Sequence, residues 1–210
     1  ADPDPYVPAP GENPWRDSTS LQVKSAAALE RIKRNAFMQS PDELHAAKPI
    51  KGVKLPKSIL FALLADWDYV TVQKKNYRLP QDPSVLEILT QYETSIDKTY
   101  HEELAAGDRE RFSASLREYF SSLCRSSLLY DDKERKQYDR MAKDELYFSS
   151  VDFYGGEHLF RLLAKLPELL SDMPESTVKE FQWAHSDFVR FCERNLATLV
   201  EDGGVFLRDA

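Results

Sequence analysis

The sequence predicts a mainly α-helical protein with a minor β element and an N-terminal extension that contains one helix. Beyond residue 53, apolar side chains recur along most of the chain at the spacing of a helix face. Residues 70–80 (VTVQKKNYRLP) alternate in the manner of a strand. Five prolines among the first 18 residues exclude a helix there. With 42% hydrophobic residues, a chain of 210 residues can bury a core of ordinary size.

The chain is expected to divide into three parts. Residues 1–18 form an extended, proline-rich segment. Residues 19–52 form an amphipathic helix, which ends at Pro41, and a linker. Residues 53–210 form the folded domain.

The domain is predicted to begin with a helix over residues 57–70, because Pro56 suits its first turn. The apolar stripe of this helix contains Ile59, Leu60, Leu63, Leu64 and Trp67. A short strand or hairpin arm follows over residues 70–80 and stops at Pro80. A long helix is then expected over residues 83–106, closed by Gly107.

The second half of the domain is predicted to be helical as well. Apolar spacing predicts helices over residues 108–126, 131–142, 157–170 and 174–199. Residues 149–156 (SSVDFYGG) are rich in turn formers, so we expect a loop there.

Charge and cysteine content exclude several classes of protein. A net charge of −7 argues against nucleic-acid binding through the overall charge of the protein, although a local basic patch is compatible with it. Two cysteines, Cys124 and Cys192, do not indicate a disulfide framework, and we interpret them as core residues in a reducing compartment. No apolar run reaches the length of a membrane span, and no secretory signal is visible.

The sequence contains no familiar catalytic, cofactor or metal-binding pattern. Its four histidines do not form H-x-x-x-H or H-E-x-x-H, and C-x-x-C and glycine-rich phosphate loops do not occur. Asp66 and Asp68 flank Trp67, but acids two positions apart on a helix point in different directions. We interpret these two acids as solvated. We interpret His158 as a structural histidine, and contact with a partner protein is the second interpretation of it. We therefore expect no catalytic residue, no metal and no cofactor.

Four blocks of the sequence go beyond composition. They are Leu55 to Pro80 (L-P-x-x-[IL] through D-W-D-x-[VI]-T-x-Q-K to L-P), Ser84 to Tyr92, Leu128 to Tyr138 (L-L-Y-x-x-x-E-R-x-Q-Y) and Tyr154 to Leu162 (Y-G-x-x-H-L-x-R-L). In order and spacing they resemble the MRG domain over residues 53–210. Ala65 stands where that family often has an acid, and the loop at residues 143–150 departs from its pattern, so the chain resembles a divergent member.

The resemblance implies an orthogonal helical-hairpin fold and a non-enzymatic interaction module in the nucleus. Such a module binds helix-plus-F-x-L-P-type peptides and recruits subunits of histone acetyltransferase and Sin3-type deacetylase complexes. A chromodomain for methylated histone is expected upstream and is not visible in this chain. By position, the implied peptide-binding residues are Leu63, Leu64, Trp67, Tyr130, Tyr154 and His158, with Asp66 and Asp68 as the polar rim. Trp67 would be a half-buried anchor; filling the core is the alternative role for it.

Residues 1–52 do not match that family in our interpretation of the sequence. They are a native linker, a fused partner segment or a lid that binds in cis. In the last two cases Leu21, Leu29, Ile32 and Phe37 are the candidate ligand, because they lie on a basic amphipathic helix that ends in FMQSP.

A different class of function stays open beside the peptide adaptor. Lys74, Lys75, Arg78 and the basic helix of the extension could bind nucleic acid or a nucleosome directly. The acidic net charge favours the adaptor. An enzyme is a distant third, because the sequence suggests no polar pocket with shifted pKa values.

Overall fold

The computed structural model describes residues 54–95, 107–171 and 175–200, and the helices predicted there are present. In chain order the elements are α3 (Lys57–Trp67), η1 (Asp68–Val72), α4 (Val85–Thr94), α5 (Asp108–Leu123), η2 (Cys124–Leu128), α6 (Asp132–Asp144), α7 (Ser150–Phe153), α8 (Gly156–Leu170), α9 (Glu175–Arg194) and α10 (Leu196–Leu199). The elements η1 and η2 are single turns of π-helix, which continue α3 and α5. The predicted mainly α fold is confirmed.

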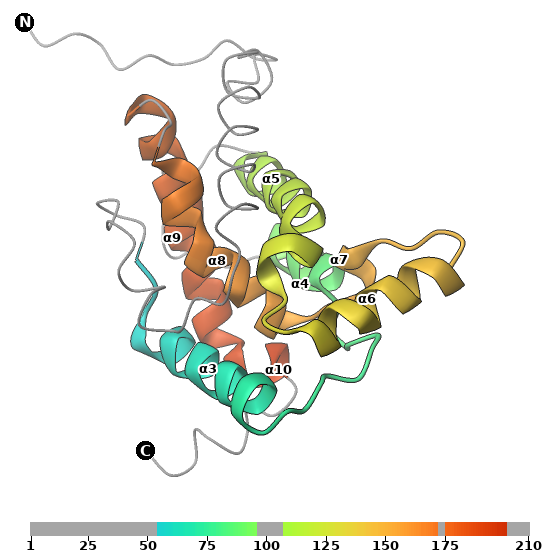
Figure 1. Ribbon diagram of the computed structural model, residues 1–210. Coiled ribbons are helices and arrows are strands. Elements are labelled where there is room, and N and C mark those ends of the chain that lie inside the picture. The colour runs from blue at the N-terminus through green and yellow to red at the C-terminus, as the bar shows by residue number, and fades with distance from the viewer. Residues whose placement is uncertain (1–53, 96–106, 172–174, 201–210) are drawn as a thin grey trace, which may run out of the picture.

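The helices surround one apolar core. The helices α4, α8 and α9 all contact α5, while α3 lies across one end of the bundle and packs on α8 (Figure 1). The largest fully buried side chains are aromatic: Tyr92, Phe120, Phe160, Phe181 and Phe188. Helix α6 projects from the side of the bundle (Figure 1). None of the described helices is both long and apolar enough to cross a membrane.

The strand predicted over residues 70–80 does not form. After η1 the chain is irregular, and Lys74 has a positive φ of 56°. No described strand lies beside it to complete a ladder, so side chains of α6 satisfy its backbone instead. Lys133 Nζ donates to the Lys74 carbonyl at 3.0 Å, and Gln137 Nε2 donates to the Tyr77 carbonyl at 3.0 Å. We refer to residues 73–80 as the coil.

The long helix predicted over residues 83–106 ends at Thr94 within the described part. It begins with a capping box, in which the Ser84 hydroxyl accepts from the Glu87 amide and the Glu87 carboxylate accepts from the Ser84 amide. It ends because Ser95 is extended, with a ψ of 126°, and because Arg109 Nη1 donates to the Ser95 carbonyl at 2.6 Å. Residues 96–106 lie outside the described residues. The loop predicted over residues 149–156 contains the short helix α7.

One buried histidine predicts a pH dependence of stability. His185 of α9 is 0% exposed, and neither ring nitrogen has a hydrogen-bond partner. Burial lowers the pKa of His185 from 6.5 to about 4. Between these values the unfolded chain binds a proton that the folded chain does not bind, so stability falls as pH falls. We expect His185 to cost about 2 kcal/mol of unfolding free energy between pH 7 and pH 5.

The measurement is urea denaturation of the wild type and of His185→Leu at both pH values. Leucine removes the titration, so the variant should lose less stability than the wild type on acidification. His158 and the carboxylates remain in both proteins and therefore cancel in the comparison. Equal losses in the two proteins would contradict the prediction.

Candidate functional site

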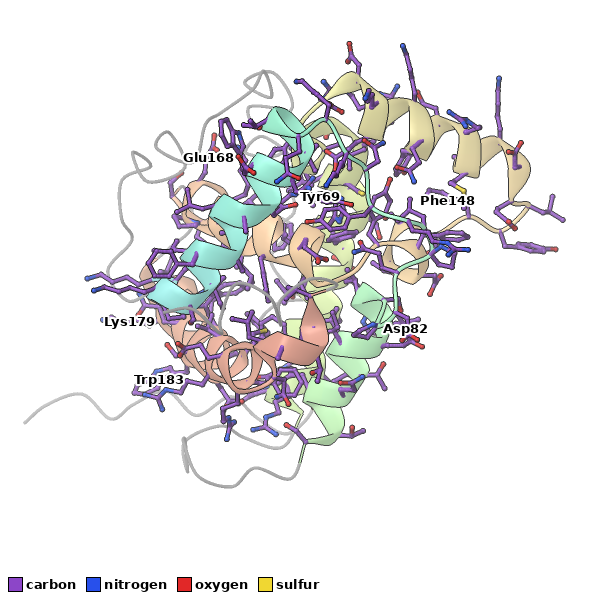
Figure 2. All side chains as sticks on the ribbon, turned by 90° about the horizontal axis from the view of Figure 1, so that it is seen from below. Tyr69, Asp82, Phe148, Glu168, Lys179 and Trp183 are labelled. Carbon is purple, nitrogen blue, oxygen red and sulfur yellow. The ribbon has the colours of Figure 1, made fainter. Side chains whose placement is uncertain are left out.

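Helix α3 carries apolar side chains toward the core and also toward solvent. Ile59 and Leu63 are buried against the core, as the apolar spacing predicts. On the outer side, however, Phe61 is 63% exposed and Leu64 is 42% exposed. Figure 2 shows α3 on the near side of the molecule, with side chains along it that point outward. Phe61 and Leu64 lie three positions apart on α3, so together they present an apolar edge to solvent.

The inner side of α3 is held by a buried ion network centred on Arg161 of α8. The guanidinium donates to both oxygens of Asp66, from Nε at 2.7 Å and from Nη2 at 2.6 Å. Its Nη1 donates to both oxygens of Glu134, at 2.9 and 3.0 Å, and to the Leu128 carbonyl at 2.8 Å. Arg161 therefore joins α3, η2, α6 and α8 at one point.

The charges of this network are arranged to compensate one another. Arg161 and Asp66 are each 2% exposed, and Glu134 is 3% exposed. Burial by itself would lower the pKa of Arg161, but attraction by Asp66 and Glu134 holds that pKa well above its ordinary value. Burial would likewise raise the pKa of Glu134, but Arg161 and His158 lower it to about 2. Arg161 and Glu134 therefore both stay charged, and Asp66 is the second acidic side chain that the guanidinium binds.

The network continues through His158 to Gln81. His158 Nε2 lies 3.3 Å from Glu134 Oε1, and its Nδ1 lies 3.2 Å from Gln81 Oε1. Burial, assisted by Arg161, lowers the pKa of His158, so the neutral ring donates its single proton to one of these oxygens at a time. Gln81 Nε2 donates to Glu157 Oε2 at 2.8 Å, and Gln81 Oε1 accepts from the Gly155 amide at 2.8 Å. These bonds anchor the end of the coil to α8.

Tyr130 is half-buried and packs against the buried network. The Arg161 guanidinium lies 3.8 Å from the centroid of its ring, a cation–π contact. Its backbone amide donates to Glu134 Oε2 at 2.6 Å. Trp67, half-buried, directly follows Asp66 in the chain. Arg161 thus links the end of α3 to Tyr130.

Chemically, this arrangement supports and shapes a surface. All six polar side chains of the chain Asp66–Arg161–Glu134–His158–Gln81–Glu157 are buried and bonded to one another. Within the described residues, no group of three or more His, Cys, Asp or Glu side chains could hold a metal ion. Cys124 and Cys192 are buried and free, and burial raises the pKa of both thiols.

The comparison with known families identifies the chain. The sequence model of the family described as MRG matches residues 30–202, which is most of the chain. The chain belongs to the MRG family. The match begins at residue 30, upstream of residue 53, where the domain was expected to begin.

Relatives in the MRG family come from a plant, a yeast and a slime mould. The chain is 34% identical over 180 residues to Protein MRG1 of Arabidopsis thaliana, covering 85% of this chain and 54% of that protein. It is 34% identical over 167 residues to Chromatin modification-related protein EAF3 of Saccharomyces cerevisiae, covering 76% of this chain and 41% of that protein. It is 33% identical over 149 residues to the NuA4 complex subunit EAF3 homolog of Dictyostelium discoideum, covering 70% of this chain and 37% of that protein. The chain thus spans about half the length of these relatives or less.

The structure of this MRG-family chain divides the predicted site residues between surface and interior. Leu64 is exposed and Trp67 and Tyr130 are half-buried, but the hydroxyl of Tyr130 is enclosed in the interior. Leu63, Tyr154 and His158 are buried, at 5%, 2% and 1% exposure. The Tyr154 and His158 rings are in contact, with centroids 4.5 Å apart. The candidate cis ligand, Leu21, Leu29, Ile32 and Phe37, lies outside the described residues.

The two predicted rim acids differ in position. Asp68 is partly exposed and accepts a hydrogen bond from Gln73 Nε2 at 2.7 Å. Asp66, interpreted above as solvated, lies in the interior because Arg161 binds both of its oxygens there. The sequence did hold a signal for this: Asp66 follows Ile59 and Leu63 at helical spacing, and thus occupies a core-facing position.

Sequence reasoning missed four other residues. Three of them belong to the buried network: Arg161, Glu134 and Gln81. The fourth is Phe61, the most exposed large apolar side chain of α3. Arg161 had a detectable signal, because it stands alone among apolar neighbours in LFRLL. An arginine in such a run is rarely fully buried unless it is paired.

Proposed function

We propose that this chain is a non-enzymatic chromatin adaptor that binds helix-plus-F-x-L-P-type peptides of partner subunits. The peptides bind at the docking face, defined as Phe61, Leu64, Trp67 and Tyr130. The observation that carries the proposal is the exposure of Phe61 and Leu64 on a helix whose other side is fastened by buried ion pairs. A rigid helix with an outward apolar edge suits helix-in-groove recognition, in which apolar anchors supply most of the affinity.

The charge around the docking face favours a basic partner peptide. Asp68 is the carboxylate beside Trp67 that reaches the surface, whereas the charge of Asp66 is compensated internally. Rim charges of this kind contribute to orientation and association rate more than to affinity. We expect the preferred peptide to carry apolar side chains on one helical face and a lysine or arginine beside them.

The names of the relatives support placing this activity in chromatin. One relative is described as chromatin modification-related and another as a NuA4 complex subunit homolog. We propose that the chain acts in the nucleus and recruits subunits of histone acetyltransferase and Sin3-type deacetylase complexes. The buried, mutually bonded polar side chains are consistent with a supporting role rather than with catalysis.

Leu64→Asp tests the docking face. The side chain is exposed, so the fold should survive, while a charge at the centre of an apolar interface should weaken binding about thirtyfold or more. The measurement is calorimetric titration of a helix-plus-F-x-L-P peptide into residues 1–210. Leu146→Asp is the matched control, because Leu146 is 86% exposed and lies outside the docking face. Equal affinities of the two variants would rule out the docking face.

A further inference from the structure

A second surface, made of basic side chains, lies on α6 and the coil. On α6, Lys133, Lys136, Arg140 and Lys143 recur at intervals of three, four and three residues and are all exposed. This spacing places them on one stripe of the helix. On the coil, Lys74, Lys75 and Arg78 are exposed as well. We call these seven residues the basic surface.

Hydrogen bonds place the two halves of the basic surface side by side. Lys133 donates to the Lys74 carbonyl, and Gln137, one residue beyond Lys136, bonds to both Asn76 and the Tyr77 carbonyl. The edge of α6 that carries Lys133 and Gln137 therefore faces the coil, and Lys136 and Arg140 follow around the helix. Tyr77 is buried, so it fastens the coil from beneath. Both views show α6 projecting from the body of the molecule (Figures 1 and 2).

The acids of α6 do not neutralise this stripe. Glu134 is buried and bonded to Arg161, and Asp139 accepts two hydrogen bonds from Arg125, at 2.6 and 2.9 Å. Asp132 is paired with Arg135. Among the described residues, none of the seven cations of the basic surface forms an ion pair. Asp144 and Glu145 are exposed carboxylates at the far end of the stripe, where Lys143 also attracts Asp139, so the positive charge is concentrated nearer Lys133, Lys136, Arg140 and the coil. A chain of net charge −7 thus has a local concentration of unneutralised positive charge.

We propose that the basic surface binds the phosphate backbone of duplex DNA. The stripe from Lys133 to Lys143 rises about 15 Å along the helix axis. Duplex DNA carries one phosphate charge for about every 1.7 Å of its axis, so several phosphates fall within reach of the stripe. The stripe has no exposed large apolar side chain between its ends, as the anchor of a peptide would require. Binding is therefore electrostatic and independent of base sequence.

The test is fluorescence anisotropy of a labelled duplex with residues 1–210 over a series of salt concentrations. Lys136→Gln combined with Arg140→Gln removes two phosphate contacts and keeps Lys133 and Gln137, which hold the coil. Loss of two contacts should reduce the slope of log K against log salt by about 1.8. We expect the Kd at low salt to rise roughly tenfold.

The matched control is Lys54→Gln combined with Lys57→Gln, which changes the net charge equally and lies outside the basic surface. This control should bind the duplex within about twofold of the wild type, since long-range charge is largely screened. Arg78→Glu in the coil is the second test variant, because it leaves every residue of α6 unchanged, and it should weaken binding in the same direction. Both test variants should bind the peptide normally, which separates this proposal from the docking face.

Three results would overturn the proposal. The first is failure of the wild type to bind the duplex at about 50 mM salt, where phosphate contacts are strong. The second is that the test and control variants bind the duplex with equal affinity and with equal slopes of log K against log salt. The third is that a polyglutamate peptide of matched charge binds more tightly than the duplex. The basic surface would then be a site for acidic protein segments.

Discussion

Replacing Arg161 with methionine should lower the free energy of unfolding by about 3–5 kcal/mol, because it leaves two buried carboxylates without a cation. Asp66 and Glu134 each receive two hydrogen bonds from the guanidinium and are almost completely buried. Methionine fills similar space but donates nothing. Guanidinium chloride denaturation of the variant and the wild type at pH 7 measures the loss.

Arg125→Met provides the matched control. Arg125 forms the same kind of paired contact with Asp139, but both side chains are about half exposed. Water screens an exposed pair, so this variant should be close to the wild type in stability. Adding Asp66→Asn and Glu134→Gln to Arg161→Met should restore part of the stability, because neutral amides would then replace the two carboxylates that the guanidinium binds. A loss for Arg161→Met no larger than that for Arg125→Met would contradict the role assigned to the network.

Gly156→Ala should cost about 3 kcal/mol, because backbone and not side chain occupies the space that a methyl group needs. A Cβ at Gly156 would lie 1.9 Å from the Leu199 carbonyl oxygen and 2.8 Å from its carbonyl carbon. Relief of this overlap requires α10 to move away from the start of α8. The measurement is the free energy of unfolding from denaturant titration, and near-ultraviolet circular dichroism reports whether tertiary packing has loosened.

Gly107→Ala separates this clash from the general cost of replacing glycine. Gly107 precedes α5 with a φ of 91°, and the nearest atoms to a Cβ there are 3.9 Å away, at the ends of flexible side chains. Only backbone strain should result, about 1–2 kcal/mol. If both alanine variants lost the same stability, the close approach of α10 to α8 would not be the cause.

The docking face depends on the same network that these variants disturb. Arg161 binds Asp66, which precedes Trp67, and lies over the ring of Tyr130. The exposed part of the surface, Phe61 and Leu64, is carried by α3, which the network attaches to α8. Stability and peptide binding should therefore weaken together in Arg161→Met, whereas Leu64→Asp should weaken peptide binding alone.

Local sequence determined most of the helices, because periodicity and caps act within a few residues. The stripe of Ile59 and Leu63 predicted α3, and Ser84 with Glu87 forms the capping box that starts α4. Gly107, predicted to close a helix over residues 83–106, takes a left-handed conformation at the start of α5. The four sequence blocks that resemble the MRG domain also led to the family that the comparison confirms.

Tertiary structure alone decided the environment of the polar residues and of the coil. Asp66 is buried rather than solvated because Arg161, 95 positions away, binds both of its oxygens. Residues 70–80 have the alternation of a strand, but a strand needs a neighbour, and in the described structure α6 supplies side-chain partners instead. Both outcomes depend on which groups the fold brings together across long separations in sequence. Helical periodicity carries no information about such contacts, because it reports only which face of a segment is apolar.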